Sequence, residues 1–227
     1  MDIEKRAAIL AAVEEALEGR RLLSHAFYQR WSRGELSVGE LGAYAGQYRF
    51  IEARLPDWLG AIQSSARNPG VRDLVQRNLD DEVGGPTTHL ELFDQFAQAV
   101  GASTLGSTEI DPATRSLLNT HDELVASSAA EGLAAVLAYE LQSPEISASK
   151  AAGLRSQYGV DGESVAFWDV HALVEDDHAT WTLDAVAAAG GEPSTAGAAA
   201  RRAADAWWAF LDEREAAAPS APVNKSE

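Results

Sequence analysis

The segment HALVEDDHATW, residues 171–181, carries two histidines and a carboxylate at helical spacing. On an α-helix, Glu175 and His178 lie within roughly 40° of His171 around the axis, at about 100° per residue. The three side chains therefore form one stripe about two turns long. Imidazole and carboxylate groups in such a stripe are either one edge of a metal site or ordinary solvated positions on a surface helix. The segment alone leaves both interpretations open.

A metal site would need matching donors from other helices, as in helical di-metal carboxylate proteins. Glu82 and His89 are seven residues apart, across a Gly-Gly-Pro break at 84–86. In an unbroken helix they would lie about 10 Å apart along the axis, and the break allows them to converge. Glu140 follows the apolar run LAAVLAY. Such a helix should be buried, and a buried ionised Glu costs several kcal/mol unless it is paired or metal-bound.

These donors form a set whose chemistry suits iron or manganese, because it combines carboxylates with imidazoles and contains no thiolate. Three carboxylates would offset three of the four positive charges of two divalent ions, which leaves a centre able to bind an anionic oxygen species. In the competing interpretation, His89 and the stripe are solvated and Glu140 marks a helix end. The predicted metal ligands are Glu82, His89, Glu140, His171, Glu175 and His178.

Composition excludes several classes of site and partner. The 227 residues are 46% hydrophobic, which is enough for a substantial core, and contain no cysteine. Disulfides, thiolate zinc sites and cysteine nucleophiles are therefore excluded. The formal net charge is −17, and no basic face is available for a phosphate backbone, so we expect no nucleic-acid partner.

The N-terminal segment MDIEKRAAILAAVEEALEG is charged and alternates in helical fashion, unlike a signal peptide. No later stretch approaches the ~20 uncharged apolar residues of a membrane span. We expect a soluble, cytoplasmic protein with no membrane partner.

The pattern of apolar residues predicts an all-α fold, because nearly every segment is amphipathic at helical period and period-two patterns are missing. Ser37 and Glu40 form a capping-box signature, and Pro56 should kink the helix that follows rather than end it. Asp111-Pro112 is typical of an N-cap and first helical position. We predict one bundle of seven or eight helices over residues 1–216 and a disordered tail over 217–227. Predicted helical segments are 3–33 with an interruption near Gly19, 37–65, 68–83, 86–101, one from 112, 133–142, 145–159, 163–189 and 196–217.

Four blocks of this sequence resemble the CADD family, which is named for the chlamydia protein associating with death domains. They are LLSHAFYQRWSRGELSVGELGAYAGQYRF, NLDDEVGGPTTH, AYELQSPEISASK and HALVEDDH, in order from about residue 20 to 185. The resemblance implies a haem-oxygenase-like bundle related to the TenA and PqqC proteins. It also implies a self-sacrificing para-aminobenzoate synthase for folate biosynthesis, with two divalent transition metals (Fe/Fe or Fe/Mn), dioxygen as co-substrate and an external reductant.

The resemblance also implies roles for individual residues. The six family ligands fall on the six residues chosen above, the excised tyrosine on Tyr28 and the amino-donor lysine on Lys150. Tyr44 and Tyr48 match other tyrosines of the family pattern. One departure is Glu175, where the family usually has aspartate. The extra methylene keeps the charge and the oxygen donors but puts metal preference and bridging geometry in doubt.

Taken without the family, Tyr28 and Lys150 look ordinary. Tyr28 is flanked by Phe27 and Trp31, which is typical of an aromatic core position, and Lys150 looks like a solvent-facing helix lysine. An amine attacks an aromatic ring only as the free base. A donor lysine should therefore be desolvated or near cations, which lower its pKa.

Several alternatives remain beside the self-sacrificing enzyme. The metals could oxidise a free small molecule, or the chain could be an interaction protein of the death-domain type. Haem binding with His25 as axial ligand rests on fold analogy alone, and His25 is expected to be a satisfied core imidazole. A TenA-type hydrolase would need a cysteine nucleophile, and PqqC-type oxidases use no metal. His121 is expected at the surface, and a homodimer is the simplest expected assembly.

Overall fold

The computed structural model describes residues 3–102 and 109–217, except for the side chains of residues 175 and 176. Within these ranges the chain is entirely helical, with no strand, which confirms the all-α prediction. The α-helices are α1 (Ile3–Ala16), α2 (Ala26–Ser32), α3 (Val38–Ser65), α4 (Pro69–Val83), α5 (His89–Ala99), α6 (Pro112–Ser127), α7 (Ala129–Glu140), α8 (Ser143–Gly153), α9 (Ala166–Ala188) and α10 (Pro193–Ala216). Three short helical turns are η1 (Leu22–Ser24), η2 (Leu154–Tyr158) and η3 (Gly162–Val165).

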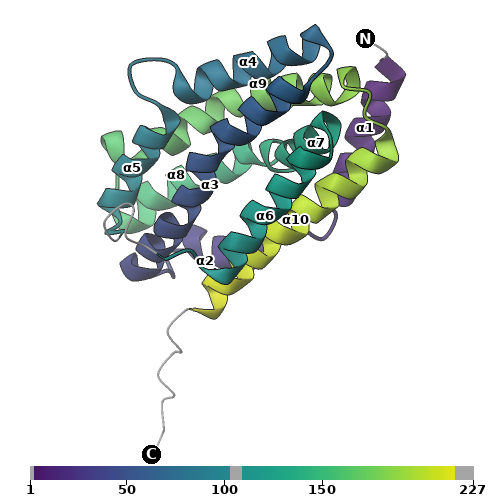
Figure 1. The fold of residues 1–227 in the computed structure, drawn as a ribbon. Helices are drawn as coiled ribbons and strands as arrows, with labels where there is room; N and C mark the ends of the chain where they lie inside the picture. Colours follow the sequence, from purple (N-terminus) through teal and green to yellow (C-terminus); the bar gives the residue numbers. More distant parts are fainter. Residues whose placement is uncertain (1–2, 103–108, 218–227) are drawn as a thin grey trace, which may run out of the picture.

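The two ends of the chain pack together along one side of the molecule, where α1 lies against α10 (Figure 1). Helix α10 also packs on α6 and α7, while α9 packs on α4, α7 and α8. Helix α3 lies against α4, α5 and α6. Helices α3, α4, α5, α7 and α9 thus surround a common interior, and they are the helices that carry the predicted ligands and the pocket between them.

Two clusters of buried side chains stabilise this arrangement. One is rich in aromatic residues and joins α2, α3, α5, α8, α9 and α10 around Trp31, Tyr44 and Trp168. The other is aliphatic and rich in alanine, and it joins α1, α4, α7, α9 and α10. Small side chains allow helices to approach closely in the second cluster, whereas large rings fill the first. The aromatic cluster is the part of the core that reaches the functional site.

Most predicted helix ends are confirmed. Ser37 and Glu40 make the reciprocal capping-box hydrogen bonds, and α3 continues through Pro56. Asp111 is the N-cap of α6 and Pro112 its first residue. The described residues contain ten α-helices rather than seven or eight, in part because the first predicted segment is divided by η1 into α1 and α2.

The described helices include none that combines the length and the apolar character needed to cross a bilayer. Residues 218–227 of the predicted tail lie outside the described ranges. The domain limits at 1–216 and 217–227 therefore stay predictions.

Candidate metal centre

The Gly-Gly-Pro break brings Glu82 and His89 together. Helix α4 ends at Val83, and Gly85 has a φ of 81°, a left-handed conformation that favours glycine. The chain then turns directly into α5, whose first residue is His89. Both side chains are buried, and the Nδ1 atom of His89 lies 3.0 Å from Oε2 of Glu82. Two residues that a continuous helix would separate by about 10 Å are thereby in direct contact.

Helix α9 supplies two more imidazoles to the same interior. His171 and His178 are both buried, and the ring centroid of His89 lies 4.5 Å from that of His171 and 6.4 Å from that of His178. One donor atom each of Glu82, His89 and His171 lies within 4.8 Å of the other two, close enough to share a cation. The side chain of Glu175 lies outside the described residues, so its predicted role as a ligand stays a prediction.

Hydrogen bonds orient two of the imidazoles for metal binding. The Nδ1–H of His171 donates to the carbonyl oxygen of Phe167 at 2.8 Å, so Nε2 is the ring nitrogen that carries the lone pair. The Nε2–H of His178 donates to Asp81 at 3.1 Å, and its Nδ1 atom lies 3.8 Å from Oε1 of Glu82. A carboxylate or carbonyl partner on the far ring nitrogen is the usual arrangement of metal-ligating histidines.

Glu140 is the last residue of α7, as the competing interpretation expects, but its side chain is not solvated and has an environment that suits a ligand. It is buried, and Nδ2 of Asn78 donates to its Oε1 atom at 2.7 Å. Its Oε2 atom is buried and has no hydrogen-bond partner among the described residues. A buried carboxylate oxygen without a donor is costly. A cation held between Glu140 and the nearby histidines would satisfy it.

The electrostatics of the cluster favour a positive ion. Burial acts to raise the pKa of Glu82, but the His89 hydrogen bond and the neighbouring imidazoles outweigh it and hold that pKa below the usual range. Burial raises the pKa of Glu140. Burial also lowers the pKa of His171 to about 4, so this ring is neutral at pH 7 and can donate its lone pair. The Glu82 carboxylate raises the pKa of His89 despite the burial of that ring. Buried acids beside imidazoles fit a transition-metal centre in donor type.

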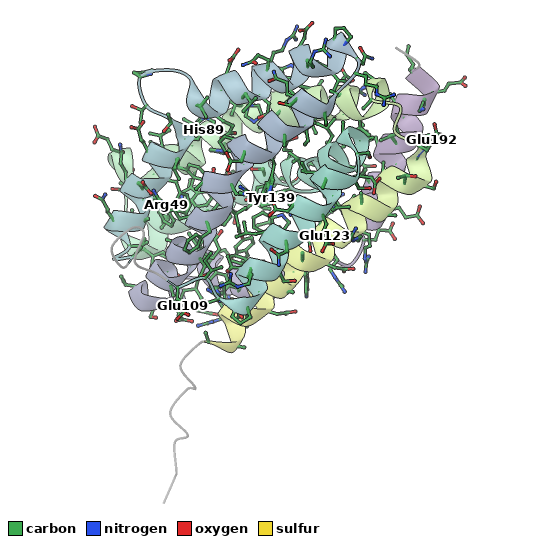
Figure 2. The ribbon with its side chains drawn as sticks, viewed as in Figure 1. Arg49, His89, Glu109, Glu123, Tyr139 and Glu192 are labelled. Atoms are coloured by element: carbon green, nitrogen blue, oxygen red, sulfur yellow. The ribbon has the colours of Figure 1, made fainter. Side chains whose placement is uncertain are left out.

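A cavity of about 50 Å³ lies between the cluster and the aromatic core. It is lined by polar groups from the cluster, by apolar side chains and by two tyrosines; the titratable residues among them are Tyr48, Glu52, Glu82, His121, Tyr139, Glu140, His171 and His178. Figure 2 shows Tyr139 towards the middle of the bundle, whereas Glu123 and Glu192 lie at its edge. The cavity therefore joins the candidate metal ligands to the tyrosines of the core.

On the aromatic side of the cavity, Lys150 is buried among rings. Its side chain is 2% exposed, so the expected solvent-facing position is wrong. Its Nζ atom donates to the Tyr44 hydroxyl at 2.6 Å and lies 4.5 Å from the ring centroid of Tyr28 and 4.1 Å from that of Trp168. Burial lowers the pKa of Lys150 well below its ordinary value, although the charge of Glu52 opposes this effect.

Tyr28 is held in the same group. Its hydroxyl lies 3.0 Å from that of Tyr44, and burial raises the pKa of the Tyr28 phenol above its ordinary value. The phenol is therefore protonated at neutral pH. The Tyr44 ring lies 5.4 Å, centroid to centroid, from that of Tyr48, and the Tyr48 hydroxyl donates to that of Tyr139 at 2.8 Å. Tyrosines thus connect the cavity to Tyr28 without a break.

Comparison with known proteins now identifies the family. A family model described as iron-containing redox enzyme matches residues 42–211. The chain belongs to this family. It is therefore a redox enzyme by descent, and its predicted haem-oxygenase-like fold is confirmed.

Relatives within the family share most of their length with this chain. A 4-aminobenzoate synthase of Nitrosomonas europaea is 35% identical over 216 residues, covering 88% of each chain. A 4-aminobenzoate synthase of Chlamydia pneumoniae is 32% identical over 171 residues, covering 74% of this chain and 76% of the relative. The resemblance to CADD proteins that the four sequence blocks carry is thereby confirmed.

Solved structures of the same fold are more distant in sequence. A TenA homologue from Pseudomonas syringae pv. tomato superposes with a TM-score of 0.78 at 17% identity, covering 92% of this chain and 93% of the other. A CADD-like protein of unknown function from Nostoc punctiforme has a TM-score of 0.71 at 19% identity, covering 91% and 98%. At these identities the likeness shows the fold alone.

Three residues that lie at the candidate site were missed by the sequence analysis. Asp81 and Asn78 on α4 support His178 and Glu140 through the hydrogen bonds above. Glu52 on α3 is buried and lines the cavity. The sequence contains one signal for Glu52. This residue follows Tyr48 by four positions and precedes Leu59 by seven, so all three lie on the same face of an amphipathic helix.

The two remaining histidines are buried and make contacts that stabilise the fold. His25 caps α2 by accepting from the backbone N–H of Phe27 and donates to Asp212, which confirms the expected satisfied core imidazole. His121 is 2% exposed and stacks on Trp58 at 4.6 Å, so its expected surface position is wrong. Burial lowers the pKa of His121 to about 4.

Proposed function

We propose that this protein is a dioxygen-dependent, dinuclear-metal 4-aminobenzoate synthase that takes the aromatic ring from its own Tyr28 and the amino nitrogen from Lys150. Support comes from the family and from relatives named 4-aminobenzoate synthase. Glu82, His89, Glu140, Glu175, His171 and His178 are the proposed ligands of two iron ions, or of one iron and one manganese ion.

One observation carries the proposal: the amine of Lys150 lies 4.5 Å from the centroid of the Tyr28 ring, inside a core that buries both side chains. A lysine in an apolar core is costly and rare unless it has a partner or a function. Here its partners are a hydroxyl and the faces of aromatic rings, and no carboxylate hydrogen bond holds it within the described core. Burial favours the neutral amine, which is the nucleophilic form.

The chemistry is consistent with these two residues. The ring and Cβ of a tyrosine contain every carbon of 4-aminobenzoate, so the Cα–Cβ bond must break and Cβ must be oxidised to the carboxyl group. The phenol oxygen must leave as the nitrogen of Lys150 bonds to the same ring carbon, and the Cε–Nζ bond of the lysine must break to release that nitrogen. These oxidations need dioxygen and an external reductant. The metal pair, when bound beside the cavity, supplies the activation of dioxygen.

The protein's own side chains position the reactants and exclude water. The Tyr44 hydroxyl holds Lys150 Nζ against the Tyr28 ring and also bonds the Tyr28 hydroxyl. The faces of Trp31 and Trp168 cover the amine on other sides, at 5.7 and 4.1 Å. Because burial keeps the Tyr28 phenol protonated, it can lose a hydrogen atom, proton and electron together, without first forming a phenolate.

The alternative function that also uses the metal centre is the oxidation of a free aromatic substrate. The cavity of about 50 Å³ is well below the roughly 150 Å³ of a cavity that accepts benzene. It has room for a molecule such as dioxygen. The geometry therefore supports a substrate that is already part of the protein.

Isotope labelling tests the proposal. Protein grown with ring-labelled tyrosine and side-chain ¹⁵N-lysine is loaded with iron and manganese, reduced and exposed to air. We expect 4-aminobenzoate that carries both labels, and a peptide in which residue 28 has lost its ring. Tyr28→Phe should give no product, whereas Tyr158→Phe should behave as wild type, because the Tyr158 hydroxyl bonds the backbone of Leu36 and Trp31 and neither Tyr28 nor Lys150. Product without label, or unchanged product from Tyr28→Phe, would refute self-sacrifice and favour a free substrate.

A further inference from the structure

Glu52 is an acidic residue of the cavity that the six predicted ligands do not include. It lies on α3, in the middle of a helix that otherwise brings aromatic and aliphatic side chains to this side of the core. Its side chain is 7% exposed, and it lines the cavity together with Glu82, Glu140 and His171. A carboxylate is seldom buried without a charge or a hydrogen-bond donor to balance it.

The geometry relates Glu52 to His171. Oε1 of Glu52 lies 3.9 Å from Nε2 of His171, which is too long for a hydrogen bond. Since Nδ1 of that ring carries the proton donated to Phe167, both facing atoms present lone pairs. Two such atoms almost 4 Å apart are spaced as two ligands of one cation, each about 2 Å from it.

The balance of charge points the same way. Glu52, Glu82 and Glu140 line the same small cavity, so three buried carboxyl groups share one site. With Glu82, Glu140 and Glu175, a fourth carboxylate would match the four positive charges of two divalent ions. A neutral centre costs less to bury than a charged one.

We propose that Glu52 is a further ligand of the metal centre, contributed by α3 to the ion that His171 binds. The inference rests on the proposed function only in requiring that the centre exists. It adds a carboxylate on the side of the cavity that faces Tyr48, and its role would be to hold one iron or manganese ion towards the tyrosines.

The alternative role of Glu52 is to serve Lys150 as a charge partner. Glu52 opposes the lowering of the Lys150 pKa, so the two groups interact electrostatically. In that case Glu52 would matter for the amine and not for metal affinity. A measurement of metal binding without turnover therefore distinguishes the two roles of Glu52.

The experiment compares wild type, Glu52→Gln and Glu52→Asp, with Asp57→Asn as a control. Asp57 is an exposed acid on the same helix that pairs with Arg54. Metal-free proteins are titrated anaerobically with Fe(II) and with Mn(II) against a chromophoric chelator. Bound metal per chain is measured by elemental analysis, and the bound Mn(II) signal by electron paramagnetic resonance.

We expect Glu52→Gln to weaken one of the two sites by at least about tenfold, to lower bound metal from two ions towards one, and to change the Mn(II) signal. Glu52→Asp should retain part of the affinity, and Asp57→Asn all of it. Far-ultraviolet circular dichroism and thermal melts of the metal-free proteins check folding, and Glu52→Gln should melt no lower than wild type because it removes a buried acid.

Two wild-type-like sites in a folded Glu52→Gln protein would overturn the inference and leave the proposed function intact. A wild-type chain that binds no iron or manganese would instead overturn the proposed function, and this ligand with it.

Discussion

Oδ2 of Asp81 lies 3.1 Å from Nε2 of His178, so the exposed edge of α4 fixes the orientation of a buried imidazole on α9. The bond turns Nδ1 of His178 towards Glu82. A carboxylate in this position holds the ring orientation and raises the basicity of the ligating nitrogen. Asp81 is therefore expected to tune metal affinity without touching the metal.

Asp81→Asn should lower the affinity for iron or manganese by about 10–100-fold. The amide offers Nε2–H a weaker acceptor and removes the charge that polarises the ring. Anaerobic titration against a chelator measures the change. Asp80→Asn is the matched control, because Asp80 is the adjacent exposed acid and bonds only Gln76 among the described side chains. Equal affinities for the two variants would contradict this role of Asp81.

Lys150→Met should abolish 4-aminobenzoate formation and at the same time stabilise the protein. Methionine keeps the length and packs well against aromatic rings, while the cost of burying an amine, about 1–3 kcal/mol, is removed. Chemical denaturation of the metal-free protein measures stability, and mass spectrometry measures product.

Lys5→Met provides the control, because Lys5 makes a surface ion pair with Glu192 of the kind that contributes about 0–1 kcal/mol. We expect it to keep product formation and to gain no stability. A Lys150→Met protein that still makes product would eliminate this lysine as the amino donor.

Acid should destabilise the metal-free protein through His121. Burial lowers the pKa of His121 from 6.5 to about 4 in the folded protein. Between pH 4 and pH 6.5, the unfolded chain therefore binds a proton at this residue that the folded chain does not. The contribution of His121 to the free energy of unfolding is therefore fully present above pH 6.5. It falls by roughly 3 kcal/mol as the pH is lowered towards 4.

Urea denaturation of wild type and His121→Asn at several pH values isolates this contribution. His171 titrates over the same range but is common to both proteins, so it cancels in the difference. The variant should be less stable at pH 7, and its deficit should shrink towards pH 4. A deficit independent of pH would show that His121 does not titrate as a buried base.

Local signals in the sequence determine much of this fold. Ser37 and Asp111 place two helix starts, because caps act through hydrogen bonds and backbone angles within a single turn. The i, i+4, i+7 stripe places His171 and His178 on one buried face of α9, since helical period alone fixes that relationship. The Gly-Gly-Pro break likewise indicates that Glu82 and His89 converge.

Burial of single polar groups is less predictable, because it depends on which helix packs against which. Lys150 lies among small residues in α8, so the sequence gives no apolar face from which to infer its direction. His121 adjoins Asp122 and looks solvated, yet it shares a face with Leu117 and Leu124, both buried. The spacing of His121 from these two leucines was an available signal, as was the position of Glu52 on the apolar face of α3; which side chains then meet across helices depends on tertiary packing.

Close packing of Gly153 against Trp31 links the stability of α8 to the tyrosine–lysine site. A Cβ atom at Gly153 would lie 2.9 Å from Cδ1 of Trp31, which is closer than side chains approach one another. The Trp31 ring cannot retreat easily, because it is fully buried against Tyr44 and Phe96. Gly153→Ala should therefore destabilise the protein by about 1–3 kcal/mol, despite alanine's better helix propensity.

Gly60→Ala is the matched control for this prediction. Gly60 lies inside α3, and a Cβ atom there would meet no atom within 4 Å. Alanine should stabilise the protein at that position by about 0.5–1 kcal/mol. Urea denaturation of both metal-free variants measures whether each substitution lowers or raises the free energy of unfolding. Because Trp31 covers Lys150, Gly153→Ala should also lower the yield of 4-aminobenzoate, and equal stability and yield in the two variants would contradict the packing described here.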